Sequence, residues 1–98
     1  MGHPSQYQAE KVMAEVNNLL EIYIDGIYSL YDRWQDEQGY EDFKEYKTAL
    51  QNIWPWKISR MTRNPFAFTF FLGGFKIKIK ITDKWGNRSL HLDLYEVD

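Results

Sequence analysis

The segment from Phe66 to Ile81 constrains the fold more than any other part of the chain. Two stretches of alternating residues flank the pair Gly73-Gly74. Adjacent glycines accept the positive φ angles of a tight two-residue turn, and a period of two places successive side chains on opposite faces of a strand. The segment therefore predicts a β-hairpin with strands over 66–72 and 75–82.

The turn also predicts which residues of the two strands face each other. One face is wholly apolar, with Phe66 opposite Ile81, Phe68 opposite Ile79, Phe70 opposite Ile77 and Leu72 opposite Phe75. The other face sets Ala67, Thr69 and Phe71 against Lys80, Lys78 and Lys76. Because ammonium groups are not buried without a partner, we expect the lysine face to meet water and the apolar face to meet the core.

A third strand is predicted over 88–97, where Leu90, Leu92 and Leu94 alternate with polar residues. We place its connecting turn at Gly86-Asn87, within a turn-rich segment. This turn pairs Ile81 with Leu92, Ile79 with Leu94, Asp93 with Lys80 and Tyr95 with Lys78. The three strands are then an antiparallel meander whose leucines lie on the apolar face.

A long amphipathic helix is predicted over 5–38, ahead of the hairpin. Ser5 followed by Gln8 matches a capping box at its start. Apolar residues follow spacings of three and four: Ala9, Met13, Val16, Leu20, Tyr23, Ile27, Leu30 and Trp34. Such a helix would extend roughly 50 Å, whereas a seven-residue strand covers only about 23 Å. We therefore expect the sheet to leave part of the helix uncovered.

Three arrangements would accommodate this difference in length, and the sequence leaves all three open. The helix bends near Gly26, it packs partly against a second helix, or its overhang pairs with another copy of the chain. In the third case the protein is a homodimer. The residues predicted for self-association are Met13, Val16, Leu20, Tyr23, Ile27, Leu30 and Trp34.

A shorter second helix is predicted over 40–53 and ends before Pro55. A further strand over 56–62 is left open, because alternation there is brief. The prediction is a single α+β domain over 1–98, in which both helices pack on one face of a three- or four-stranded antiparallel sheet.

Composition limits the setting in which the protein works. None of the 98 residues is cysteine, which excludes disulfides and thiolate metal sites and fits the reducing cytoplasm. No apolar run has the length of a membrane span, and the start of the chain lacks the pattern of a signal peptide. We therefore expect a cytoplasmic protein that does not enter a membrane.

Charge is strongly segregated along the chain. Residues 10–45 carry a net charge of −7, and residues 57–88 carry +7. The exposed lysine face combines Lys76, Lys78 and Lys80 with the rings of Phe71 and Tyr95, and Arg60, Arg63, Lys84 and Arg88 would extend it. Rings that stack on bases and cations that follow phosphates are typical of single-stranded nucleic-acid binding. Alternating lysines that keep an apolar hairpin soluble explain the same pattern.

The remaining candidates for a site are weak. His91 and Asp93 share one strand face, but two side chains do not complete a metal or catalytic site. The acids around Gly39 lack the spacing of a calcium loop, and Gly73-Gly74 lacks that of a phosphate loop. Trp54, Trp56 and Trp85 serve either as core rings or as binding anchors.

No catalytic residue, metal site or cofactor is therefore predicted. The sequence favours a small non-enzymatic protein-interaction module that self-associates and presents its charged faces to a protein partner. The alternative is a nucleic-acid-binding protein that uses the lysine face.

Overall fold

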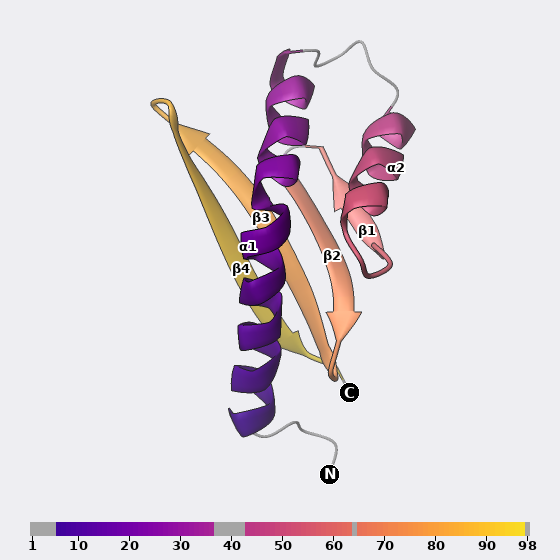
Figure 1. Cartoon of the computed structure of the whole chain (residues 1–98), viewed down its shortest axis with the longest axis vertical. Coiled ribbons are helices and arrows are strands. Elements are labelled where there is room, and N and C mark those ends of the chain that lie inside the picture. The colour runs from indigo at the N-terminus through magenta and orange to yellow at the C-terminus, as the bar shows by residue number, and fades with distance from the viewer. Residues whose placement is uncertain (1–5, 37–42, 64, 98) are drawn as a thin grey trace.

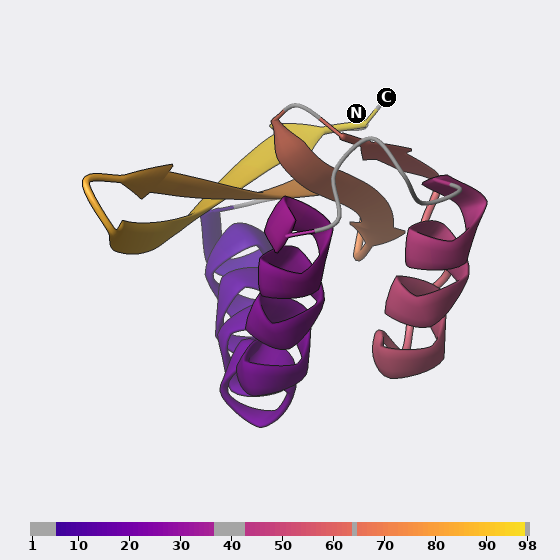
Figure 2. The ribbon, with the colours of Figure 1, turned by 90° about the horizontal axis from the view of Figure 1, so that it is seen from above.

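The computed structural model describes residues 6–36, 43–63 and 65–97. The elements in chain order are α1 (Gln6–Asp36), α2 (Phe43–Ile53), β1 (Arg60–Thr62), β2 (Phe66–Leu72), β3 (Phe75–Lys84) and β4 (Asn87–Glu96). The four strands form one antiparallel sheet in the order β1-β2-β3-β4, and both helices lie on the same face of it (Figures 1 and 2). The predicted α+β arrangement is confirmed. The predicted cap at Ser5, the acidic segment around Gly39 and the start of the second helix lie outside the described residues.

The predicted β2–β3 hairpin is confirmed, including its register from Phe66 opposite Ile81 to Leu72 opposite Phe75. Gly73 and Gly74 form the turn with φ angles of 61° and 85°. The turn also packs against α1, because a Cβ atom built on Gly73 would lie 2.6 Å from Cγ2 of Val12. The glycine pair therefore serves both the turn and the contact between sheet and helix.

The predicted register between β3 and β4 is wrong by two residues. The turn lies at Trp85-Gly86, whose φ angles are 57° and 80°, and not at Gly86-Asn87. The structure pairs Ile81 with Leu90, Ile79 with Leu92, Lys80 with His91, Lys78 with Asp93 and Lys76 with Tyr95. This register gives every residue of the two ten-residue strands a partner. Trp85 takes the left-handed conformation that the first position of such a two-residue turn requires. A shift of two residues keeps the alternation, so the leucines remain on the helix side.

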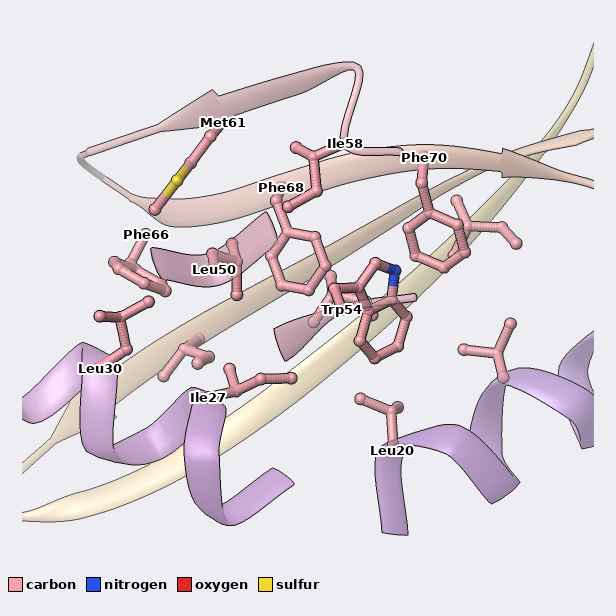
Figure 3. Close-up of a cluster of buried hydrophobic side chains, with 14 of the residues drawn as sticks. Leu20, Ile27, Leu30, Leu50, Trp54, Ile58, Met61, Phe66, Phe68 and Phe70 are labelled. Atoms are coloured by element: carbon pink, nitrogen blue, oxygen red, sulfur yellow. The ribbon is translucent and has the colours of Figure 1, made fainter. Parts of the chain in front are cut away.

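The core lies between the helices and the inner face of β2 and β3. Its side chains include Phe66, Phe68, Phe70, Ile77, Ile79 and Ile81 from the sheet, Val16, Ile27 and Leu30 from α1, and Leu50 from α2. Figure 3 shows the Trp54 ring beneath Phe68 and Phe70, with Leu20 and Ile27 of α1 on its other side. The Trp54 ring centroid lies 5.5 Å from that of Phe68 and 5.1 Å from that of Phe70. Trp54 is thus a core residue rather than a binding anchor.

Helix α1 runs without interruption through Gly26. A Cβ atom at Gly26 would lie 3.4 Å from Cδ1 of Ile53, so the glycine is where the end of α2 packs against α1. Of the two predicted arrangements within one chain, the structure shows packing against the second helix. The uncovered part of α1 is also smaller than predicted, because β3 and β4 have ten residues each and extend from Val12 at one end of α1 to Asp32 near the other.

The strand left open over 56–62 exists but covers only Arg60–Thr62. The connector between α2 and β1 precedes this strand. Its Trp56 ring stacks on Phe70 with a centroid distance of 5.4 Å, which holds the connector against the sheet. The Gln51 side chain fixes the same connector, donating from Nε2 to the Trp56 carbonyl (2.9 Å) and accepting the Ile58 amide at Oε1 (2.7 Å). The connector therefore makes these contacts in place of strand pairing.

Candidate binding surfaces

The two faces of the molecule differ in charge. Acidic residues of α1 that are exposed, such as Glu15, Glu21 and Asp25, lie on the helix layer. Lys76, Lys78 and Lys80 lie on the opposite face of the sheet, which neither helix covers (Figure 2). The fold therefore sets the lysines of β3 apart from the exposed acidic residues of α1.

A hollow of about 410 Å³ opens on this uncovered sheet face. Side chains from all four strands surround it. Its lining is Ser59, Arg60, Thr62, Pro65, Ala67, Phe68, Thr69, Lys76, Lys78 and Tyr95. We call this group of residues the outer hollow. It combines three cationic side chains, three hydroxyl groups and one phenol ring, which are groups that bind phosphate and stack on a base.

The hydroxyl groups of the outer hollow are held by the pairing of β1 with β2. Ser59 and Thr69 share a hydrogen bond of 2.8 Å between their side-chain oxygens, and the Ser59 amide donates to the Thr69 carbonyl. Thr62 Oγ1 donates to the Pro65 carbonyl at 2.7 Å. These bonds fix the side of the outer hollow where Arg60 emerges.

The β3–β4 ladder forms the other side of the outer hollow. The Lys76 ammonium lies 5.4 Å from the centroid of the Tyr95 ring, which orients the cation by a cation–π contact. Lys78 is paired with Asp93, whose carboxylate reduces the positive charge there. Arg60 and Lys76, in contrast, have uncharged cross-strand partners.

Three of the five residues predicted for nucleic-acid binding meet at the outer hollow: Lys76, Lys78 and Tyr95. Lys80 lies further along β3, opposite His91. Phe71 is 53% exposed but lines different hollows, one beside Trp56 and Lys57 and one at the β2–β3 turn. Sequence analysis missed Ser59 and Thr62, because their position depends on a strand that alternation alone left open.

Arg88 does not extend the basic face as predicted. Its Nη1 donates to Oδ2 of Asp32 on α1 at 2.7 Å, and its guanidinium lies 4.5 Å from the centroid of the Tyr28 ring. Arg88 shares its strand face with the leucines of β4, and therefore points to the helix side of the sheet. Arg63 also contacts a ring, with its guanidinium carbon 5.4 Å from the Phe43 centroid.

His91 and Asp93 lie on one face of β4, as predicted, and each has a neighbour on β3. His91 Nε2 hydrogen-bonds to Thr82 Oγ1 at 3.0 Å. Among the described residues, no group of three or more His, Asp or Glu side chains lies close enough to hold a metal ion. Of the tryptophans considered as anchors, Trp85 is 98% exposed at the tip of the β3–β4 hairpin.

Six of the seven residues predicted for self-association lie in the core of their own chain or pack against it: Val16, Leu20, Tyr23, Ile27, Leu30 and Trp34. Val16 and Ile27 are fully buried, Leu20 and Leu30 are nearly so, and Met13, Tyr23 and Trp34 are partly buried. These six side chains pack toward the sheet and α2. Within one chain, the apolar spacing of α1 thus serves to cover the sheet.

A second apolar surface lies where α1 meets β4. Leu90, Leu92 and Leu94 are only partly buried, although they occupy the inner face of the sheet. A groove of about 530 Å³ runs beside them, lined by Asn17, Leu20, Glu21, Ile24, Tyr28 and Leu90. We call this the β4 groove. It borders the outermost strand of the sheet, whereas α2 packs near the opposite edge (Figure 2).

Comparison of the chain with protein-family models, curated proteins and solved structures found no match. Neither described helix combines the length and apolar character needed to cross a membrane.

Proposed function

We propose that the protein is a small non-enzymatic interaction module that self-associates through the β4 side of its sheet. The observation that carries this proposal is the uncovered strand β4, with its half-buried leucines and the β4 groove beside it. Sheet edges are commonly protected by shortness, charged side chains (lysine above all) or proline. β4 has ten residues and contains neither lysine nor proline, and its charged residues Arg88, Asp93 and Glu96 leave its central leucines unprotected. The cysteine-free composition supports the cytoplasm as the place where the module works.

Light scattering coupled to size exclusion tests self-association directly. We expect a mass near twice the 11.8 kDa of one chain, at both low and high salt. A protein that stays monomeric at every concentration contradicts the proposal.

A pair of variants tests which side of the molecule is used. Leu92→Asp places a charge on the β4 side and should yield monomers. Ile22→Asp makes the same change at a helix position that is 68% exposed, and should leave the dimer intact. Far-UV circular dichroism checks that each variant retains its fold.

The outer hollow favours a second candidate function, the binding of single-stranded nucleic acid. Arg60, Lys76 and Lys78 are placed to contact phosphates, and Tyr95 offers a ring to a base. The net charge of −2 does not oppose this function, because the acidic residues of α1 lie on the other side of the sheet.

Fluorescence polarisation of a labelled single-stranded oligonucleotide, measured over a salt series, tests this candidate. Lys76→Glu should weaken binding and lower the salt slope by about 0.7, the value for one lost phosphate contact. Lys11→Glu makes the same change of charge on α1 and should have little effect. Absence of binding at low salt removes the candidate without affecting the proposed self-association.

A further inference from the structure

The backbone of β4 offers one set of hydrogen-bonding groups to β3 and leaves another set at the sheet edge. The Val97 amide donates to the Gly74 carbonyl oxygen at 3.1 Å, which continues the β3–β4 ladder. Bonds in an antiparallel pair involve every second residue. The odd-numbered residues of β4 therefore bond to β3, and the even-numbered residues from Arg88 to Glu96 direct their N–H and C=O groups to the free edge.

The side chains of the same segment are self-complementary about Leu92. In an antiparallel pair of two β4 strands centred on Leu92, a residue that follows Leu92 by a given number of positions lies opposite the residue of the other copy that precedes Leu92 by the same number. This places Arg88 opposite Glu96, Ser89 opposite Tyr95, Leu90 opposite Leu94 and His91 opposite Asp93, each twice. Basic groups thus meet acidic groups, and leucines meet leucines. The even-numbered residues also face each other, which an exchange of edge hydrogen bonds requires.

We propose that two copies of the chain join their β4 strands antiparallel, with the two-fold axis at Leu92, to form a continuous eight-stranded sheet. This proposal rests on the proposed self-association and specifies its strand, its register and its partner, a second copy of the chain. Pairing of edge strands is a common route of association, because main-chain hydrogen bonds supply affinity and side chains set the register.

The apolar surfaces support the same register. The two-fold axis is perpendicular to the sheet, so the leucines of both copies lie on the face that carries the helices. Leu94 of the second copy is beside Leu90, which lines the β4 groove. The pairing thus covers leucines that a single chain leaves half-buried.

The neighbouring registers are less favourable. Moving the axis to His91 places the two imidazoles opposite each other, and moving it to Asp93 places the two carboxylates opposite each other. Like charges directly across a strand pair destabilise it, whereas opposite charges stabilise it. Of these three registers, the one centred on Leu92 is the one that sets Asp93 opposite His91 and Arg88 opposite Glu96.

Disulfide trapping tests the register, and the chain is suited to it because it contains no cysteine. Residues 91 and 93 of opposite copies form a pair without main-chain hydrogen bonds, with Cα atoms about 4.5 Å apart. Disulfides need Cα atoms closer than about 7 Å. A mixture of His91→Cys and Asp93→Cys proteins should form the mixed dimer under mild oxidation. Either variant alone should cross-link poorly, because its two cysteines lie roughly 8 Å apart across the axis.

Charge reversal tests the same contact without a new covalent bond. Within one chain residue 91 faces Lys80, so His91→Asp is tolerated by the monomer. Across the dimer it faces Asp93 twice, and we expect about tenfold weaker dimerisation. The double variant His91→Asp with Asp93→Asn removes the like charges across the axis without placing a second cation opposite Lys78, and should recover most of the affinity.

The outcomes separate the two levels of the proposal. A wild-type protein that remains monomeric contradicts both self-association and this register. A dimer whose affinity is unchanged by His91→Asp, and that does not cross-link between positions 91 and 93, overturns the β4 pairing but leaves the proposed self-association standing. Efficient linkage of His91→Cys with itself, or of Asp93→Cys with itself, overturns the axis at Leu92.

Discussion

Gly73 in the β2–β3 turn lies against Val12 of α1, so closely that a Cβ atom at the glycine would be 2.6 Å from Cγ2 of the valine. The contact joins the most local feature of the fold, a two-residue turn, to the N-terminal part of its longest helix. A substitution at Gly73 therefore tests the packing of the sheet against α1 as well as the turn itself.

The first prediction concerns this contact. Gly73→Ala should destabilise the protein in two ways, by about 1–2 kcal/mol for the left-handed backbone and by about 1–3 kcal/mol for the clash with Val12. Gly86→Ala is the matched control, since its φ of +80° is also positive but no atom lies within 4 Å of its Cβ position. Urea denaturation should show the larger loss for Gly73→Ala. Equal losses would mean that the Val12 side chain moves aside at no cost in stability. In a Val12→Ala background, the additional loss caused by Gly73→Ala should be smaller.

The second prediction concerns Gln51, whose amide bridges the connector between α2 and β1. Gln51→Glu keeps the shape but replaces the donor to the Trp56 carbonyl with a carboxylate oxygen. The carboxylate oxygen and the Trp56 carbonyl oxygen are then two acceptors without a donor between them. We expect this to lower the free energy of unfolding by about 1–3 kcal/mol. Asn52→Asp changes the adjacent exposed amide and should cost much less. Similar values for both would refute the bridging role.

The third prediction concerns Trp85 at the tip of the β3–β4 hairpin. Its φ of 57° is a left-handed conformation that a bulky side chain rarely adopts, and its ring is 98% exposed. Trp85→Asn creates the Asn-Gly pair that favours such turns, and should raise the free energy of unfolding by about 1 kcal/mol. A lower denaturation midpoint would show that the indole contributes to the folded state. A higher denaturation midpoint would mean that the tryptophan at this position lowers the stability of the fold.

The fourth prediction concerns pH. Burial raises the pKa of Tyr31, and the carboxylates of Asp83 and Asp32 raise it further. In the unfolded chain the phenol ionises near 10.0, whereas in the folded protein it resists ionisation. The stabilisation is therefore complete below that pH and is lost as the pH rises through the folded value. Denaturation curves above pH 10.0 should show a steeper loss of stability for the wild type than for Tyr31→Phe. Parallel losses would show that other groups cause the alkaline transition.

Local sequence patterns predicted those parts of the fold that depend on neighbouring residues. The register of β2 and β3 follows from Gly73-Gly74, because a two-residue turn leaves no freedom in pairing. The β3–β4 turn was predicted wrongly, because Asn87 is a better turn residue than Trp85 and because alternation does not distinguish two registers that differ by two residues. Alternation survives a shift of two, so the error moved partners but left every side chain on its predicted face.

The apolar stripe of α1 shows a different limit of sequence reasoning. Residues such as Val16 and Ile27 satisfy the spacing for a helix seam and for a sheet cover equally well. The length of β3 and β4, and the position of α2 at Gly26, show that within one chain the stripe covers the sheet. The outer hollow was predicted in part, because Lys76, Lys78 and Tyr95 follow from alternation, while Ser59 and Thr62 depend on a three-residue strand.

The unequal edges of the sheet have a consequence for how large an assembly can become. One edge is the three-residue β1 and the other the ten-residue β4. A sheet with two long edges can recruit copies at both sides and grow into a filament. Here a union of two β4 strands would consume the long edge of each copy and leave only two short ends outside. Growth would then stop at the pair, and the shortness of β1 would act as a terminator of polymerisation.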